Sequence, residues 1–358
     1  MLRGYSSIAH VALSKSTYVD GMPFLGGGSW LRGLTRREPL RASAEPGVVV
    51  GVGELDRAAA HTVPVRQPAR RVRAALVTSR PRQWIKNGLL VAAAGAAGAL
   101  GHDDVPVRVG LACAAFCLLA SGIYAVNDVR DAREDRGHPR KRHRPVAAGE
   151  LDPRAALALG AAMMLIGLGL CAFVSPLLAL VGAGYVALTL SYTMFWRHIA
   201  MLDVVAIAGG FVLRAVAGGV AAPVTLSRWF VLVVTFAAVF VAVGKRQAEL
   251  RRTAGTKVAG RRVLKLYTTS RLRLMLAASS SAALFAYCVW ALELPTVDGI
   301  PWRPLTIAPF AACLARYAAL TGAGDGEAPE DALLSDRRLQ IAAAAWLLLF
   351  ALGVHAAG

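Results

Sequence analysis

Three aspartates and one asparagine stand close together near one third of the way along the chain and could bind a metal ion. Residues 127–135 read NDVRDARED, beginning with Asn127. On a helix, the spacing of three and then four residues places Asp128, Asp131 and Asp135 on one face. Stacked carboxylates repel one another unless a cation lies among them. Oxygen ligands of this kind are typical of Mg²⁺, which shares its remaining positions with waters and substrate phosphates. We therefore predict a catalytic magnesium site made by these four residues.

A basic stretch follows directly and could bind phosphate groups. It runs from His138 to Arg144 and includes Arg140 and Lys141. A magnesium site beside fixed cations fits a ligand that carries several phosphates. The alternative is a solvated loop in which acids and bases neutralise one another, which is what charge runs usually are. The position of the acids directly after a long apolar run favours the functional interpretation.

Long apolar runs recur after residue 86 and predict helices that cross a membrane. The chain of 358 residues is 56% apolar and only 17% charged. An apolar run of about 18 residues is long enough to cross a bilayer. Because these runs do not alternate polar and apolar residues, they are helices rather than barrel strands. We predict an all-α fold with about nine spans. Their expected limits are 86–102, 108–126, 154–174, 176–195, 202–222, 229–245, 272–292, 304–320 and 339–356, with a tight hairpin at Ser175-Pro176.

The basic residues lie in alternate loops between these runs. The loops 127–154 and 245–265 are rich in Lys and Arg, whereas 103–107, 223–228 and 293–303 carry almost none. This positive-inside pattern predicts a multi-pass protein of the plasma membrane, with the amino terminus and both basic loops in the cytoplasm and the carboxyl terminus outside. The net charge of +18 therefore reflects membrane orientation, and no nucleic-acid-binding module is visible.

The first part of the chain differs from the rest. It has scattered arginines, a run of three glycines and no helical period. We predict that residues 1–78 are a disordered basic cytosolic extension, and that residues 79–358 form the catalytic membrane domain.

The segment NDVRDARED, the basic stretch after it and the sequence RPVAAG at 144–149 resemble the first signature of the UbiA superfamily of intramembrane prenyltransferases. The resemblance covers the chain from Ser79 to its end. It implies a ring of helices around a central cavity, and Mg²⁺ that holds a diphosphate. Typical members carry a second motif, DxxxD, after the sixth span. Here residues 244–252 read GKRQAELRR, with one acid and several bases. This departs from the second magnesium-diphosphate motif of the family, and the added cations indicate an extra phosphate on the donor.

Segments 79–87, 203–219 and 244–250 resemble one branch of this superfamily in particular. Members of that branch transfer the 5-phosphoribosyl group from 5-phosphoribosyl-1-diphosphate to polyprenyl (decaprenyl) phosphate and release pyrophosphate. The resemblance therefore implies a Mg²⁺-dependent phosphoribosyltransferase whose product serves cell-wall arabinan synthesis. It leaves the length of the polyprenyl chain and the oligomeric state open.

Further residues are predicted to bind substrate. Lys86, Lys245 and Arg246 are expected to orient phosphates, and Arg214 carries a charge within a span, where it must face a polar cavity or a partner. For several of these residues a structural role is the alternative: interfacial anchoring for Lys86, or an ion pair with another helix for Arg214. The full set is Arg82, Lys86, Asn87, Asn127, Arg140, Lys141, Arg144, Tyr192, Asp203, Arg214, Lys245, Arg246, Glu249 and Arg271.

The sequence leaves two other classes of function as alternatives. A prenyltransferase that joins a prenyl diphosphate to an aromatic acceptor should carry two aspartates in the second motif, and these are not found. A transporter with a polar midplane would carry its acids within spans, whereas here they cluster at the end of one. Both alternatives predict no transfer of phosphoribose to lipid.

Overall fold

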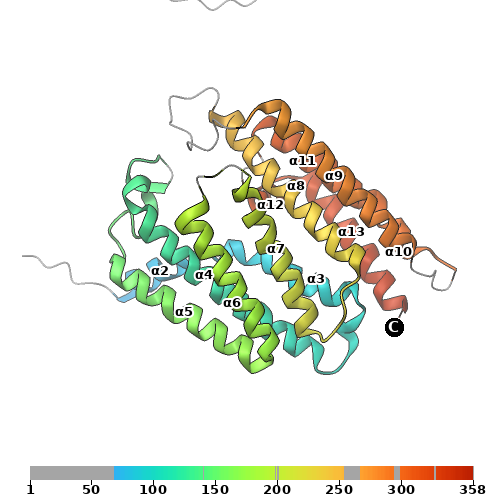
Figure 1. Ribbon diagram of the computed structural model, residues 1–358, viewed down its shortest axis with the longest axis horizontal. Coiled ribbons are helices and arrows are strands. Elements are labelled where there is room, and N and C mark those ends of the chain that lie inside the picture. The colour runs from blue at the N-terminus through green and yellow to red at the C-terminus, as the bar shows by residue number, and fades with distance from the viewer. Residues whose placement is uncertain are drawn as a thin grey trace, which may run out of the picture. The chain divides into compact units, whose positions relative to one another are not determined.

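The structure, a computed structural model, describes residues 68–139, 141–197, 199, 201–253, 267–293, 299–325 and 328–357. These residues form a helical bundle without strands (Figure 1). Helices α4, α5 and α6 pack on one side of it, and α8, α9, α11 and α13 on the other, with α3 and α7 between them. The elements are α2 (Pro68–Ser79), η1 (Pro81–Asn87), α3 (Gly88–Ala96), η2 (Ala99–Gly101), α4 (Val105–Arg136), η3 (Lys141–His143), α5 (Pro153–Val174), α6 (Pro176–Ser191), η4 (Tyr192–Trp196), α7 (Leu202–Ala221), α8 (Arg228–Thr253), α9 (Thr269–Leu292), α10 (Trp302–Leu305), α11 (Ile307–Ala323), α12 (Pro329–Ser335) and α13 (Arg337–Ala357).

Within the described residues, eight helical segments are long and apolar enough to cross a membrane, and they match eight of the nine predicted spans. The predicted first span, 86–102, is instead built from η1, α3 and η2. Gly98 adopts a left-handed conformation (φ +71) between α3 and η2, which a regular helix excludes. The broken segment still passes through the bundle, because Lys86 contacts α12 at one end while Ala96 lines a cavity with Pro223 at the other.

One end of the bundle collects the charged ends of several helices, and we call it the basic end. Ion pairs join Asp131 of α4 to Arg197 before α7, Asp203 of α7 to Arg246 of α8, and η1 to Glu330 of α12. Both predicted basic loops, 127–154 and 245–265, begin at this end. The arrangement agrees with the loop pattern of the sequence, and the side of the membrane that this end faces stays a prediction.

The hairpin between α5 and α6 is confirmed. Ser175 ends α5, and its hydroxyl accepts a hydrogen bond from the N–H of Leu178 at 3.1 Å, which caps α6. Pro176 occupies the first position of α6, where its missing N–H leaves no helical bond unmade. A serine followed by proline therefore both stops one span and starts the next.

Helix α2, except for its last residue Ser79, lies within the segment 1–78 that the sequence predicts to be disordered. For residues 68–78 the structure differs from that prediction, because α2 packs against α4. Ala74 is 2% exposed and belongs to a buried cluster with Ala132, Val146 and Ala156. Residues 1–67 lie outside the described part of the chain, and for them disorder stays a prediction.

The close contact of α3 with α7 depends on Gly218. A Cβ at this position would lie 2.3 Å from the carbonyl oxygen of Leu90 and 2.7 Å from its Cα, both backbone atoms. We expect Gly218→Ala to destabilise the protein by about 1–3 kcal/mol through overpacking, measured as a lower unfolding midpoint in detergent. At Gly184 a Cβ would meet nothing within 4 Å. Gly184→Ala is therefore the control, and an equal loss in both variants would contradict the packing argument.

Candidate functional site

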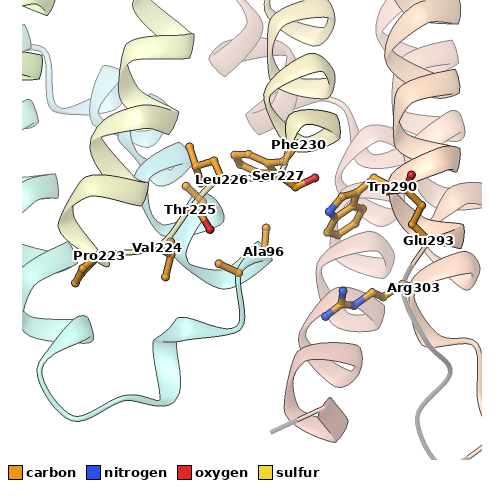
Figure 2. A pocket seen from close by; sticks show the side chains of 12 residues that line it. Ala96, Pro223, Val224, Thr225, Leu226, Ser227, Phe230, Trp290, Glu293 and Arg303 are labelled. Atoms are coloured by element: carbon orange, nitrogen blue, oxygen red, sulfur yellow. The ribbon is translucent and has the colours of Figure 1, made fainter.

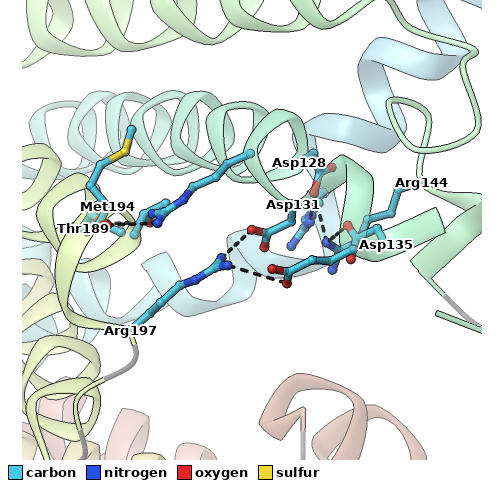
Figure 3. Close-up of polar contacts among 11 residues, drawn as sticks. Asp128, Asp131, Asp135, Arg144, Thr189, Met194 and Arg197 are labelled. Atoms are coloured by element: carbon cyan, nitrogen blue, oxygen red, sulfur yellow. Dashed lines mark hydrogen bonds and ion pairs between the residues drawn. The ribbon is translucent and has the colours of Figure 1, made fainter. Parts of the chain in front are cut away.

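The three predicted aspartates lie on one side of the last turns of α4 (Figure 3). Asp128 and Asp135 are buried, 2% and 4% exposed, while Asp131 is partly buried. The helix can continue this far because Arg133 and Arg136 in its last turn complement the negative end of the helix dipole. We call this surface of Asp128, Asp131 and Asp135 the acid face, and it points into the protein rather than into bulk water.

Arginines from outside α4 neutralise the two buried aspartates. Arg80 donates a hydrogen bond to Asp128, and its guanidinium lies 4.8 Å from the centre of the Tyr124 ring. The Nη1 atom of Arg144 lies 3.3 Å from Asp128 Oδ1 and 2.7 Å from Asp135 Oδ2 (Figure 3). One guanidinium nitrogen therefore bridges two carboxylates, so this position accommodates a positive charge.

Arg197 forms an ion pair that neutralises Asp131. It follows the π-helical turn η4 at the end of α6, where it donates to Asp131 and lies 3.7 Å from Glu134 (Figure 3). The sequence analysis did not select Arg197 or Arg80. Arg80 belongs to the segment 79–87 that carries the family resemblance, and Arg197 is a basic residue at the same end of a span as the acids. The sequence therefore contained a feature that could have identified each of them.

Arg80 is held in a strained backbone conformation. Its φ of 50° and ψ of 62° are left-handed, and it directly precedes Pro81. For a residue with a Cβ this conformation costs roughly 1–2 kcal/mol. Such strain persists only where surrounding contacts fix it, and it clusters at functional sites. Here the ion pair with Asp128 and the Tyr124 ring supply those contacts.

The acid face fits a divalent cation that is shared with phosphate oxygens. The Oδ1 atom of Asn127 is buried and has no hydrogen-bond partner among the described residues. Arg144 already places a positive charge between Asp128 and Asp135. Over the described part of the chain, no three His, Cys, Asp or Glu side chains converge closely enough to hold a metal alone. Phosphate oxygens would complete the coordination, which is how Mg²⁺ commonly binds.

Arg214 and Asn87 meet inside the bundle. Arg214 is 6% exposed and donates to Asn87 Oδ1 at 2.8 Å, to the Tyr185 hydroxyl at 2.6 Å and to the carbonyl of Gly210 at 3.0 Å. These partners are all neutral, and Arg214 forms no ion pair within the described residues. The alternative of an ion pair with another helix is therefore not what the structure shows. A buried, uncompensated cation of this kind attracts an anion.

Lys86 lies beside this pair and contacts α12. Its Nζ is 3.2 Å from Glu330 Oε2, and it donates a hydrogen bond to Gln83, which in turn donates to Glu330. The sequence analysis did not select Glu330. The run Pro329-Glu330-Asp331 is what a helix start commonly looks like, so the local pattern gave Glu330 no functional meaning.

Asp203, Arg246 and Glu249 are brought together, mainly with one another. The Nε atom of Arg246 lies 2.8 Å from Asp203 Oδ2, and both side chains are 1% exposed. Arg246 also contacts Glu249, and the Tyr267 hydroxyl donates to Asp203 Oδ1 at 2.7 Å. These predicted substrate-binding residues therefore form one connected network in which Asp203 and Arg246 are buried.

The remaining predicted residues are more dispersed. Arg82 and Arg271 are exposed, while Lys141 in η3 and Lys245 in α8 are partly buried and each have partners. Tyr192 begins η4, the turn that leads to Arg197. Arg140 lies outside the described residues.

An apolar cavity borders the buried cations. It has a volume of about 280 Å³, and Leu89 and Phe211 stand among its lining residues. Leu89 comes two residues after Asn87, and the Phe211 ring centre is 5.7 Å from the guanidinium of Arg214. A larger cavity of about 690 Å³ at the far end of the bundle shares Phe230 and Trp290 with it (Figure 2). Charged groups and an apolar space thus adjoin, as a ligand with an anionic head and an apolar tail requires.

Comparisons with known proteins agree with this architecture. Residues 88–342 match the model of the UbiA prenyltransferase family. The decaprenyl-phosphate phosphoribosyltransferase of Corynebacterium glutamicum is 39% identical, over 81% of this chain and 90% of that protein. The protein of the same name from Mycolicibacterium smegmatis is 41% identical, over 75% and 88%. A UbiA homolog from Archaeoglobus fulgidus, bound to GPP and Mg²⁺, has the same fold with a TM-score of 0.60 at 18% identity, over 79% of this chain and 99% of that one.

Proposed function

This chain belongs to the UbiA prenyltransferase family, and from that premise we propose that it is a transferase that moves a phosphoribosyl group onto decaprenyl phosphate. It is a multi-pass membrane protein. Relatives whose name states this reaction align with most of the chain at 39% and 41% identity. The structural observation that supports the proposal is the acid face with its arginines, standing next to buried cations and an apolar cavity.

The donor in this proposal is 5-phosphoribosyl-1-diphosphate, with its diphosphate at the acid face. Asn127, Asp128, Asp131 and Asp135 would hold Mg²⁺ together with diphosphate oxygens. When bound, the ion stabilises the negative charge that develops on the departing pyrophosphate. Arg80, Arg144 and Arg197 exchange carboxylate partners for phosphate oxygens, which the planar guanidinium fits as a fork.

The acceptor phosphate is proposed to bind at Lys86 and Arg214, with its polyprenyl tail in the apolar cavity beside Leu89 and Phe211. The phosphate is an anion near neutral pH, so the attack on carbon 1 of the ribose requires no strong general base. Attack from the face opposite the diphosphate inverts the anomeric centre. The bundle keeps water from the reacting carbon and so limits hydrolysis of the donor. We also propose that the basic end faces the cytoplasm, as the positive-inside pattern predicts.

A transfer assay tests this function. We expect the purified protein, incubated with radiolabelled 5-phosphoribosyl-1-diphosphate and decaprenyl phosphate, to give a labelled lipid. Chelation of divalent ions should abolish the label, and added Mg²⁺ should restore it, because without the ion the negative charge that develops on the departing pyrophosphate is not stabilised. A prenyl diphosphate with an aromatic acceptor should give no product. Labelling only in that second reaction would contradict the proposal and identify a conventional prenyltransferase instead.

A further inference from the structure

We propose that Glu330 of α12 is a positioning residue that, together with Gln83, holds the ammonium of Lys86 in place to bind the acceptor phosphate. The inference rests on the proposed function, since it assigns Lys86 a part in binding that acceptor. It adds a residue from the short helix between the last two spans, a part of the chain that contributes nothing to the acid face.

The side chains of Lys86, Gln83 and Glu330 form a triad in which each contacts the other two. Lys86 Nζ lies 3.2 Å from Glu330 Oε2, Lys86 donates to Gln83 Oε1, and Gln83 Nε2 donates to Glu330 Oε1. Each side chain therefore touches both of the others. Glu330 is 7% exposed, and a buried carboxylate persists in a fold when it is paired and hydrogen-bonded. The triad fixes both the position and the charge of Lys86.

Helix α12 is itself anchored, so it can act as a support. Ala332, 4% exposed, packs in a buried cluster that also contains Tyr317 of α11 and Val243 of α8. Pro329 stands at the start of the helix, where its fixed φ is already helical. The carboxylate of Glu330 is therefore placed by packing rather than by Lys86 alone.

The charges around Lys86 show why it needs this partner. Glu330 attracts its ammonium from α12, while Arg214 on α7 repels it, and the phenol of Tyr185 on α6 also faces it. Tyr124 of α4 and Tyr317 of α11 face Glu330. Burial by itself raises the pKa of Glu330, but the charge of Lys86 and hydrogen bonds, among them the one from Gln83, outweigh burial and hold that pKa below its usual range. Glu330 is thus an anion at neutral pH and offsets the repulsion between two buried cations.

The balance of these charges matches a phosphate monoester. Lys86 and Arg214 carry two positive charges and Glu330 carries one negative charge, so the group attracts an anion without holding a large excess of positive charge. Loss of the Glu330 charge would leave Lys86 beside Arg214 without its anionic partner, so the repulsion between the two cations would no longer be offset. The acceptor phosphate would then meet an ammonium that is no longer held in place, and its binding would weaken.

Steady-state kinetics of Glu330→Gln test the inference in the full-length enzyme. We expect the acceptor KM to rise about tenfold, as for the loss of a charged binding contact. The donor KM should change less than about twofold. Glu330→Asp, which keeps the charge, should restore part of the acceptor affinity. Asp331→Asn removes the same charge from an exposed neighbour on α12 and should match the wild type.

A second comparison guards against simple loss of folding. Lys86→Met should weaken acceptor binding, and Glu330→Gln added to it should cause no further loss, because Glu330 acts through Lys86. Losses that multiply in the double variant would overturn the inference. A raised donor KM with an unchanged acceptor KM would also overturn it, as would a Glu330→Gln variant with the same acceptor KM as Asp331→Asn. A wild-type enzyme that transfers no phosphoribose to lipid would instead refute the proposed function.

Discussion

Replacement of Asp128 by asparagine is expected to reduce transfer by at least about 1,000-fold while leaving the protein folded and membrane-inserted. Asp128 is the most buried acid of the acid face and contacts both Arg80 and Arg144. Asparagine keeps the shape of the side chain but removes the charge that a divalent ion requires. Both arginines would then face a neutral amide. Transfer of radiolabel to lipid, together with the gel-filtration profile in detergent, measures the two parts of the prediction.

A matched control lies in the same segment. Glu134→Gln makes the same chemical change at a side chain that is 78% exposed, and it should leave the rate within about twofold of the wild type. Asp131→Ala should also abolish transfer in a protein that still inserts. Full activity in either Asp128→Asn or Asp131→Ala would refute the magnesium assignment.

Replacement of Arg246 by methionine is expected to destabilise the protein by about 3–5 kcal/mol, because it leaves Asp203 as a buried charge without its partner. The two side chains are 1% exposed and 2.8 Å apart. Arg246 joins the end of α8 to the start of α7, and Tyr267 adds a hydrogen bond from the segment before α9. The unfolding midpoint in detergent gives the effect, with Arg273→Met, an exposed arginine on α9, as the control.

This prediction separates two roles for Arg246. The sequence analysis assigned Arg246 to orienting phosphates, whereas its burial against Asp203 and Glu249 leads us to propose a structural role. If that role is correct, the folded fraction of Arg246→Met should keep the donor KM of the wild type at low temperature. A stable variant with a strongly raised donor KM would instead support the phosphate contact.

The features that the sequence predicted well are local. The spacing of Asp128, Asp131 and Asp135 fixes their common face through helix geometry alone. The spans follow from runs of apolar residues, and the hairpin at Ser175 follows from serine and proline at a helix start. The first span was predicted as one helix because its composition is apolar, and composition does not reveal the left-handed turn at Gly98.

The features that the sequence did not predict are contacts between distant parts of the chain. Arg80 reaches Asp128 across 48 positions, Arg197 reaches Asp131 across 66, and Gln83 reaches Glu330 across 247. No periodicity carries such information, since each contact exists only once the helices have packed. The same limit explains why Arg246 resembles a free phosphate-binding residue in the sequence and a buried ion-pair partner in the fold.

Binding of Mn²⁺, a paramagnetic substitute for Mg²⁺, tests the magnesium site most directly. The electron paramagnetic resonance spectrum of Mn²⁺ would be recorded with the wild type and with Asp128→Asn, each with and without 5-phosphoribosyl-1-diphosphate. We predict that the ion is immobilised only when the wild type and the donor are present together, because the acid face and the diphosphate each supply part of the coordination. Equal immobilisation by Asp128→Asn, or none by the wild type with donor, would contradict a metal site at the acid face.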